Sequence, residues 1–371
     1  MDVRTAERSR RDIIRFSHAG LDSRALRLAV LGRLCKVIPI DAFWCATVDP
    51  ATMLFTGSLI EGIPESVTPA FLTNEFLHDD VNKFAQLAGG VPVVRSLHDA
   101  TGGDLSTSAR YREILAPLGW GDELRAALMT GGACWGVMCL HRERGTSAFS
   151  ATEAAFLAHL TPHIAEGLRA ALLLDNADTI RQTNGPGLLV LADDFSIIAT
   201  TPTAERWLAE MGDWPRRAEA PQAVRAVAAR LWALERGEET GAALMPRVRI
   251  RTRAGEWVVL HAARLSGLGG GTAVILERAQ PLEVAPLILQ AYDLTEREAG
   301  IAALVLRGLS TGEIVAALSI SALTVQQHLK AVFDKTGVNS RRALVALVFA
   351  EQYKPRMAAG SRLNSAGTFT T

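Results

Sequence analysis

Four polar side chains near the C-terminal end of this 371-residue chain have the chemistry and the spacing to read a nucleic acid: Thr324, Gln326, Gln327 and Lys330. The amide of a glutamine can make two hydrogen bonds to adenine, and a lysine ammonium can donate to guanine or to a phosphate. If a helix presents these groups outward, they would meet base edges in the major groove of DNA.

Local capping chemistry predicts the helices that would hold these groups. Two pairs have the Ser/Thr-x-x-Glu spacing of a capping box, Thr295 with Glu298 and Ser310 with Glu313. Gly308 and Gly337 stand where helices need a residue that tolerates positive φ in order to end. The first helix is therefore predicted from about Glu296 to Arg307, and the third is predicted to end near Thr336.

Only three residues separate the predicted second and third helices, which is typical of a helix-turn-helix: Ser319, Ile320 and Ser321. Ser321 is free to cap the third helix. Helical periodicity gives that helix an apolar stripe that would pack on the second helix, formed by Val325, Leu329, Val332 and Phe333. The polar groups must then face outward, although the spacing alone also fits a four-helix protein-contact module.

This segment resembles the LuxR/FixJ/NarL-type helix-turn-helix of bacterial transcription regulators. The matching positions are Leu294-Thr295, Arg297-Glu298, Gly308-Leu309-Ser310, Glu313-Ile314, Leu318, Ile320-Ser321, Thr324-Val325, His328-Leu329, Lys335, Gly337-Val338 and Ser340-Arg341. The resemblance continues into a fourth helix, Arg341 to Glu351, which in that family often mediates dimer contact.

The resemblance implies a set of DNA-contacting residues. They are Ser321, Thr324, Gln326, Gln327, His328, Lys330, Lys335 and Arg341. Positions 326, 327 and 330 would read bases, and the others would contact phosphates or brace the fold. The family usually has lysine at the position of Gln326, so one cationic contact is missing here. Gly300 inside the first helix is also unusual and costs about 1 kcal/mol relative to alanine.

The charge of this segment indicates that it works as a dimer. The whole chain carries 39 basic and 39 acidic residues, and Tyr292 to Arg356 has eight basic against six acidic residues, a net charge of +2. Because phosphate contacts supply most non-specific affinity, a monomer this weakly basic should bind DNA poorly. A homodimer would read an inverted repeat whose half-sites lie about 10 bp apart. The resemblance also implies RNA polymerase as a partner.

The N-terminal part of the chain predicts a mixed helix and strand domain. Its predicted elements are a helix from about Ser23 to Val37, strands Ala42 to Val48 and Met53 to Leu59, helical segments near Pro69 to Leu87 and Ser106 to Leu115, a strand at Val91 to Val94, a hairpin of Glu123 to Thr130 with Ala133 to Arg142, and an exit helix running toward Leu174. Asp49-Pro50 and Gly131-Gly132 mark turns, and Ser150 with Glu153 forms a capping box.

This order resembles a GAF domain, and Trp135-Gly136 on the last hairpin strand is the most recognisable detail. GAF domains commonly bind small molecules or mediate dimers. A ligand pocket would lie between the sheet and the middle helices, with candidate walls Phe43, Trp44, Phe55, Phe76, Trp120 and Trp135. Ordinary core packing is the alternative for each of these side chains, and the sequence does not identify a ligand.

A second block of strands resembles a diverged PAS domain. Its predicted elements are strands at Gly187 to Leu191 and Ile197-Ile198 joined by an acidic turn, a helix around Thr203 to Glu210, and strands Arg247 to Arg253, Trp257 to Ala263 and Thr272 to Glu277. No flavin-attachment cysteine or haem-ligand signature is present, so no cofactor is predicted. Four alternating arginines would share one strand face, predicted to be solvated or a dimer surface: Arg247, Arg249, Arg251 and Arg253.

The chain lacks the motifs of an enzyme. It has no GxxxxGK[ST] phosphate loop, no G-x-S-x-G elbow and no Cys/His zinc spacing. His159 and His163 with Glu166 have a spacing that could hold zinc, but Pro162 interrupts that turn and no His-Glu-x-x-His pattern is present. We therefore predict no catalytic residues and no metal site.

The chain also lacks the sequence marks of a membrane or secreted protein. No apolar run reaches the roughly 18 residues of a membrane helix, and the N-terminus has no signal-peptide pattern. Four cysteines do not make a disulfide framework in a chain of this size. We expect a cytoplasmic protein that does not contact a membrane.

The sequence therefore predicts a multidomain α+β protein with a GAF-like domain at 1–175, a PAS-like domain at 176–281, a four-helix LuxR-type helix-turn-helix at 282–354 and a disordered tail at 355–371. The expected function is dimeric, ligand-controlled regulation of transcription. Two alternatives stay open: a signalling adaptor that does not bind DNA, and an acyl-homoserine-lactone receptor. The second alternative, the acyl-homoserine-lactone receptor, rests on the stretch Glu75 to Val81. The other interpretation of this stretch is the end of a surface helix.

Overall fold

The computed structural model describes residues 2–90, 92–172, 185–211, 220–237, 245–253, 255–266, 271–345, 347–348, 362–363 and 369–370. The chain divides into two compact units. The first comprises Met1–Leu174, Gly185–Ile250 and Val259–Glu277, and the second comprises Asp175–Asn184, Arg251–Val258 and Arg278–Thr371. The architecture is multidomain α+β, as the sequence predicts.

The first sheet is antiparallel and has the strand order β2-β1-β5-β4-β3. Its strands are β1 (Ala42–Val48), β2 (Phe55–Glu61), β3 (Val94–Ser96), β4 (Trp120–Thr130) and β5 (Ala133–Glu143). The predicted hairpin is confirmed, because β4 and β5 turn at Gly131 and Gly132, whose φ values are 58° and 74°. Such angles favour glycine because it has no Cβ.

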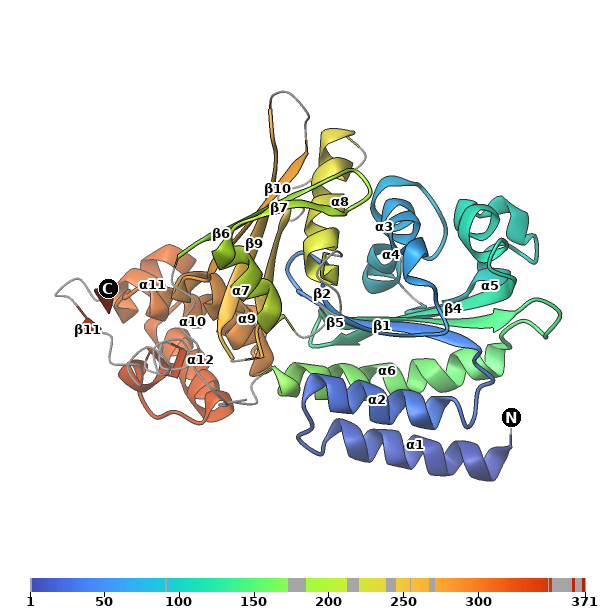
Figure 1. The fold of residues 1–371 in the computed structure, drawn as a ribbon. Coiled ribbons are helices and arrows are strands. Elements are labelled where there is room, and N and C mark those ends of the chain that lie inside the picture. The colour runs from blue at the N-terminus through green and yellow to red at the C-terminus, as the bar shows by residue number, and fades with distance from the viewer. Residues whose placement is uncertain are drawn as a thin grey trace. The chain divides into compact units, whose positions relative to one another are not determined.

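Helices cover both faces of this sheet, as Figure 1 shows. On one face lie α1 (Val3–Ser17), α2 (Ser23–Leu34) and α6 (Ala151–Ala171), and on the other lie α3 (Thr68–Leu77) and α4 (Phe84–Gly89). Gly167 allows the close packing of α6, since a Cβ there would lie 2.6 Å from Leu26 Cδ2 and 2.7 Å from the carbonyl oxygen of Ser17. The capping box of Ser150 and Glu153 begins α6 as predicted.

Two stretches of this region differ from the sequence prediction. The helical segment predicted near Pro69 to Leu87 is broken into α3 and α4, and Asn82 between them has a φ of 57°. Instead of one helix over Ser106 to Leu115, the chain has a 3₁₀ turn at Leu105–Thr107 and a π-helical turn at Tyr111–Leu115, after the short helix α5 (Leu97–Ala100). Helix α1 was not predicted.

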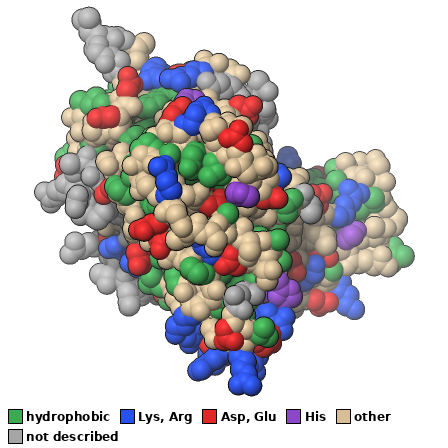
Figure 2. Space-filling model, turned by 90° about the vertical axis from the view of Figure 1, so that its right-hand side faces the viewer, with side chains coloured by type: hydrophobic (Ala, Val, Ile, Leu, Met, Phe, Trp, Pro, Cys, Tyr) green, Lys and Arg blue, Asp and Glu red, His purple; other side chains and the backbone are tan. Residues whose placement is uncertain are grey.

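The α1 helix is strongly basic on its exposed side. Figure 2 shows basic side chains gathered at the lower end of the face it presents, the end at which α1 lies in Figure 1. The exposed arginines of this helix are Arg4, Arg8, Arg11 and Arg15. Although the net charge of the chain is zero, positive charge is concentrated on the exposed side of α1.

The second sheet has the order β7-β6-β10-β9-β8, so its strands follow the same pattern as the first sheet. They are β6 (Gly187–Leu191), β7 (Ile197–Thr200), β8 (Arg247–Arg251), β9 (Trp257–Arg264) and β10 (Thr272–Arg278), and all five were predicted within a few residues. The predicted helix is α7 (Pro202–Glu210). A further helix, α8 (Gln222–Glu235), was not predicted and packs against α3 and β2 of the first sheet region.

The predicted solvated arginine face is wrong at Arg249. This side chain is only 9% exposed, and its Nε and Nη2 donate to Asp49 Oδ2 and Oδ1 at 2.8 and 2.6 Å. The backbone nitrogen of Arg249 also donates to Asp49 Oδ2 at 3.0 Å. The partner is 200 residues away in sequence, so alternation within the strand could not indicate it.

The C-terminal part of the described chain is mainly helical. It contains α9 (Pro281–Ala291), which was not predicted, α10 (Glu296–Leu306), α11 (Thr311–Leu318) and α12 (Ala322–Thr336). Residues 341–345 and 347–348 are helical, in the region predicted to hold the fourth helix, whose predicted end at Glu351 lies outside the described residues. Within the predicted tail, β11 (Arg362–Leu363) pairs with β12 (Phe369–Thr370). None of the helices in the described part of the chain has the length and apolar character to cross a membrane.

Candidate DNA-binding helix and sensor cavity

Two capping boxes and a left-handed turn fix the geometry of the helix-turn-helix. Thr295 and Ser310 each accept from the amide of the glutamate three residues later at 3.3 Å, and each donates its own amide back to that carboxylate, at 2.8 and 2.7 Å respectively. Ser319 has a φ of 52° and ends α11, and the Ser321 hydroxyl accepts from the Thr324 amide at 3.1 Å to begin α12. These starts and ends agree with the sequence prediction.

Helix α12 has one buried and one exposed face. Val325, Leu329 and Val332 are buried, Phe333 is half-buried, and Ile314 of α11 is completely buried, so the predicted apolar stripe is confirmed. This packing holds the helix by its apolar side. Its polar side is therefore left to face solvent or a partner.

All three predicted base-reading side chains are exposed on α12: Gln326, Gln327 and Lys330. Thr324 and His328 are half-buried, and the Thr324 hydroxyl lies 2.8 Å from the Ser321 hydroxyl. Leu323, which the sequence did not single out, is 69% exposed in the first turn of the same helix. An apolar side chain there can contact the methyl group of thymine.

Two residues of the predicted DNA-contacting set make intramolecular contacts that brace the domain. Lys335 Nζ donates to Glu298 Oε2 at 2.7 Å and to the Asp293 carbonyl oxygen at 3.0 Å. Arg341 donates to the Leu309 carbonyl oxygen and to the Thr311 hydroxyl, both at 2.8 Å. Of the two roles that the resemblance allows, bracing is the one that this geometry supports for both residues.

The Lys335 contact changes the acidity of its partner. Burial would raise the pKa of Glu298, but the hydrogen bonds from Lys335 and Thr295 outweigh it, so the pKa lies below its ordinary value. Glu298 is thus the carboxylate of a capping box and the partner of a lysine on α12. One side chain links the start of α10 to the end of α12.

A small cavity of about 40 Å³ lies between the first sheet and helices α3 and α4. Its walls are Trp44, Phe55, Ile60, Ile63, Val67, Thr68, Phe71, Leu72, Glu75, Phe84, Arg125, Cys139 and Gln222. The volume exceeds the roughly 10–15 Å³ that a single water molecule needs. Two of the predicted pocket aromatics therefore line a cavity in the predicted place.

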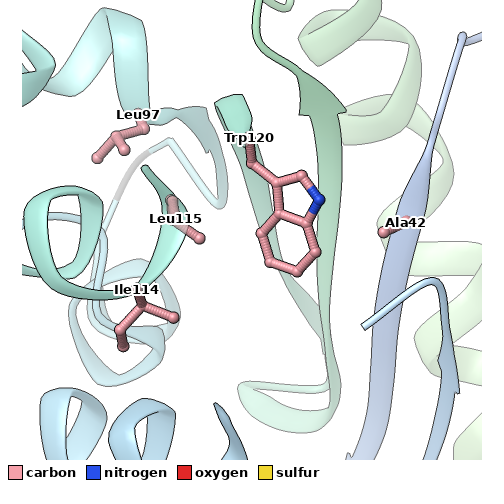
Figure 3. Close-up of a cluster of buried hydrophobic side chains, with 5 residues drawn as sticks. All are labelled: Ala42, Leu97, Ile114, Leu115 and Trp120. Carbon is pink, nitrogen blue, oxygen red and sulfur yellow. The ribbon is translucent and has the colours of Figure 1, made fainter. Parts of the chain in front are cut away.

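The other four predicted pocket aromatics do not line this cavity. Phe76 lies behind Phe55, with ring centroids 5.6 Å apart, and Phe43 is buried in the core. Trp135 is buried, and its indole donates to the Thr130 carbonyl oxygen at 3.3 Å. Trp120 belongs to an apolar cluster, shown in Figure 3, with Ala42, Leu97, Ile114 and Leu115. For these four, core packing is the role that the structure supports.

The polar end of the cavity belongs to a buried ion network. Arg125 Nη1 donates to Glu75 Oε2 at 2.7 Å, and Arg125 Nε lies 3.1 Å from Glu123 Oε1. Arg110 Nε donates to Glu123 Oε2 at 2.8 Å, and its backbone nitrogen donates to Asp80 Oδ2 at 2.7 Å. Burial would raise the pKa of Glu123, but the two guanidinium groups lower it to about 2, so this carboxylate is ionised.

This network corrects the interpretation of Glu75 to Val81 as a surface helix end. Glu75 is 6% exposed and lines the cavity, and the Asp80 side chain is 1% exposed.

The spacing of His159, His163 and Glu166 on α6 does not form a three-ligand zinc site, because Glu166 pairs with Arg169 in the same helix. Pro162 lies inside that helix without ending it.

The comparison with known proteins identifies the C-terminal domain. Residues 293–348 match the model of the bacterial regulatory proteins of the luxR family. They form a LuxR-family helix-turn-helix domain. A search of curated proteins found no match to the chain.

A search of solved structures found matches with low sequence identity and low TM-scores. The GAF domain of phosphoenolpyruvate-protein phosphotransferase from Acinetobacter is 13% identical over 48% of this chain and 100% of that chain, with a TM-score of 0.33. SdiA from Escherichia coli is 12% identical over 93% of this chain and 97% of that chain, with a TM-score of 0.35. SdiA in complex with octanoyl-rac-glycerol is 13% identical over 95% of this chain and 97% of that chain, also with a TM-score of 0.35. The family assignment of the LuxR domain rests on residues 293–348.

Proposed function

We propose that this protein regulates transcription by binding an inverted-repeat DNA site as a homodimer, under the control of its N-terminal sheet domains. The observation that carries the proposal is the polar face of α12, where Gln326, Gln327 and Lys330 are exposed at the N-terminal half of a LuxR-family recognition helix. Residues in this position of a helix-turn-helix contact base edges in the major groove.

Electrostatics support the dimer. The segment from Tyr292 to Arg356 has a net charge of only +2, and Lys335 and Arg341 are engaged within the domain. Few cations are then left to displace the counterions that provide non-specific affinity. Two linked domains double both the phosphate contacts and the base contacts.

The sensory part of the proposal rests on the cavity of the first sheet domain. A mainly apolar cavity that ends in a few polar groups, here Glu75 and Arg125, is a common form of ligand site. We propose a GAF-like domain at 1–175, a PAS-like domain at 176–281 and a DNA-binding domain at 282–354. The regulator would act in the cytoplasm, where bacterial DNA lies, and would contact RNA polymerase. The proposal includes no catalytic activity.

The experiment is selection from a random duplex library with the full-length protein, followed by affinity measurements at several salt concentrations. We expect a preferred inverted repeat, and Gln326→Ala or Gln327→Ala should weaken binding to that repeat by about 1–3 kcal/mol while leaving binding to other DNA nearly unchanged. Gln290→Ala, on α9 and outside the helix-turn-helix, is the matched control. Failure to enrich any duplex would overturn the proposal and favour an adaptor that does not bind DNA.

A further inference from the structure

Three side chains of metal-binding chemistry meet on the inner face of the first sheet. Glu123 of β4 lies opposite His141 of β5 in the antiparallel register, and Cys139 precedes His141 by two residues. Residues two apart on a strand point to the same face. Their carboxylate, thiol and imidazole ligand atoms all lie within 4.8 Å of one another.

The three groups are buried, and the imidazole of His141 has no hydrogen-bond partner. Glu123, Cys139 and His141 are 1%, 2% and 0% exposed. Neither ring nitrogen of His141 has a hydrogen-bond partner in the structure, whereas Glu123 Oε2 accepts from Arg110 Nε at 2.8 Å and Glu123 Oε1 lies 3.1 Å from Arg125 Nε. Because nearly all buried polar atoms in proteins are partnered, a buried imidazole with two unpartnered nitrogens needs an explanation.

The surroundings hold the imidazole ring in a fixed orientation. The ring of His141 stacks on Trp120, with centroids 4.2 Å apart and planes 18° apart. A neutral imidazole has one ring nitrogen without a proton, and that nitrogen is a potential metal ligand. Oε1 of Glu123 keeps a lone pair beside the 3.1 Å contact with Arg125 Nε.

The charge of the buried network also favours a cation. Arg110 and Arg125 are joined by ion pairs to three carboxylates, those of Glu75, Asp80 and Glu123. Two positive and three negative charges leave a formal charge of −1. A divalent ion that displaces the Cys139 thiol proton to solvent adds two positive charges and one negative charge, so the network becomes neutral.

We propose that Glu123, Cys139 and His141 bind one zinc-class divalent transition-metal ion beside the cavity between the first sheet and helices α3 and α4, which Cys139 lines. Thiolate, imidazole and carboxylate together suit zinc and related ions rather than magnesium or calcium. Metal bonds of about 2.0–2.3 Å place tetrahedral ligand atoms about 3.3–3.8 Å apart, so side-chain shifts of about 1 Å would close the site.

Such a site would leave one coordination position for a further ligand. Three protein ligands and an open fourth position are typical of zinc sites that act on or sense small molecules. Cys139 also lines the cavity, together with Arg125 and Glu75. A molecule entering the cavity could then bind the metal directly through a nitrogen, sulfur or oxygen donor. The inference goes beyond the DNA-binding proposal and does not depend on it.

The test uses the full-length protein, stripped with a chelator, reloaded with Zn²⁺ and desalted. We expect mass spectrometry to find one zinc ion per chain, and Co²⁺ to give the near-ultraviolet charge-transfer absorption of a cobalt–thiolate bond. Cys139→Ser should lose that absorption and at least tenfold in zinc affinity. Cys134→Ser is the matched control, because Cys134 is also buried on β5 but its thiol donates to the Gly136 carbonyl oxygen and is outside the cluster.

The outcomes separate this inference from the proposed function. Wild-type protein that is folded by circular dichroism but binds neither Zn²⁺ nor Co²⁺ would overturn the metal site, as would Cys139→Ser that keeps full zinc affinity. A second variant, His141→Asn, should also lose the zinc while a normal thermal unfolding curve shows that the fold is kept. Binding to a selected DNA duplex is measured separately, so metal-free protein that binds DNA would refute only the metal site.

Discussion

Lys335→Gln distinguishes a lysine that braces the helix-turn-helix from one that contacts DNA phosphate. Its ammonium lies 2.7 Å from Glu298 Oε2, and the two side chains are 35% and 10% exposed. An exposed ion pair contributes about 0.2–1 kcal/mol, and a hydrogen bond to a charged group up to about 3 kcal/mol. For this half-buried pair we expect the variant to lose about 1 kcal/mol, which increases the opened population of the domain about fivefold.

Hydrogen exchange read by mass spectrometry measures this loss where it should occur. Amides of α10 and α12 should exchange about fivefold faster in Lys335→Gln, and amides of the first sheet should be unaffected. Lys330→Gln is the matched control, because Lys330 is exposed on the same helix and its substitution should leave exchange unchanged.

DNA binding provides the opposite readout. Lys330→Gln should make the slope of log binding constant against log salt concentration shallower by about the contribution of one phosphate contact. Lys335→Gln should leave that slope unchanged. If Lys335→Gln lowers the slope and leaves the exchange rates as in the wild type, Lys335 contacts phosphate and the bracing role is refuted.

Three further predictions concern stability. Gly300→Ala should stabilise the C-terminal domain by about 1 kcal/mol, because Gly300 is exposed in α10 and a Cβ there would meet no atom within 4 Å; slower exchange of α10 amides checks this, and faster exchange would contradict it. Asp49→Ala should destabilise the first unit by about 3–5 kcal/mol in urea unfolding, since it leaves the buried guanidinium of Arg249 without its carboxylate; a loss below 1 kcal/mol would count against the buried pair. Because the pKa of Glu298 is lower in the folded domain than its ordinary value of 4.5, ionised Glu298 stabilises the folded state above that pH, and this stabilisation is lost as the pH falls below it. Glu298→Gln should therefore reduce the loss of unfolding free energy at acid pH. An unchanged dependence of unfolding free energy on pH would exclude this role.

The parts of the fold set by neighbouring residues could be predicted from the sequence. The capping boxes at Thr295 and Ser310 depend on a partner three residues away, and the hairpin turn at Gly131-Gly132 depends on two adjacent glycines. These interactions are complete within one turn or one hairpin, so the sequence carries all of their determinants. Helix α8 lacks such a signal, because its N-cap, Pro221, makes no side-chain capping bond.

The features that sequence reasoning missed depend on distant partners. Asp49 pairs with Arg249 across 200 residues, and Lys335 reaches Glu298 across 37. The cluster of Glu123, Cys139 and His141 joins two strands through their register, so no continuous metal-binding spacing exists to be found. Leu323 was missed for another reason: an apolar residue at a helix start suggests burial, and only the packing of α12 leaves it exposed.

Helix α8 gives the cavity a wall that comes from the second sheet region. Gln222, its first residue, lines the cavity, and Arg225 pairs with Glu65 while the Arg230 guanidinium lies over the Phe76 ring. A molecule that binds the cavity more tightly with α8 in place must, by the same free energy, hold α8 more firmly in place. The coupling free energy between the docking of α8 and ligand binding is then the same in both directions, so a substitution on α8 that weakens its docking would also weaken binding of a ligand in the proposed site.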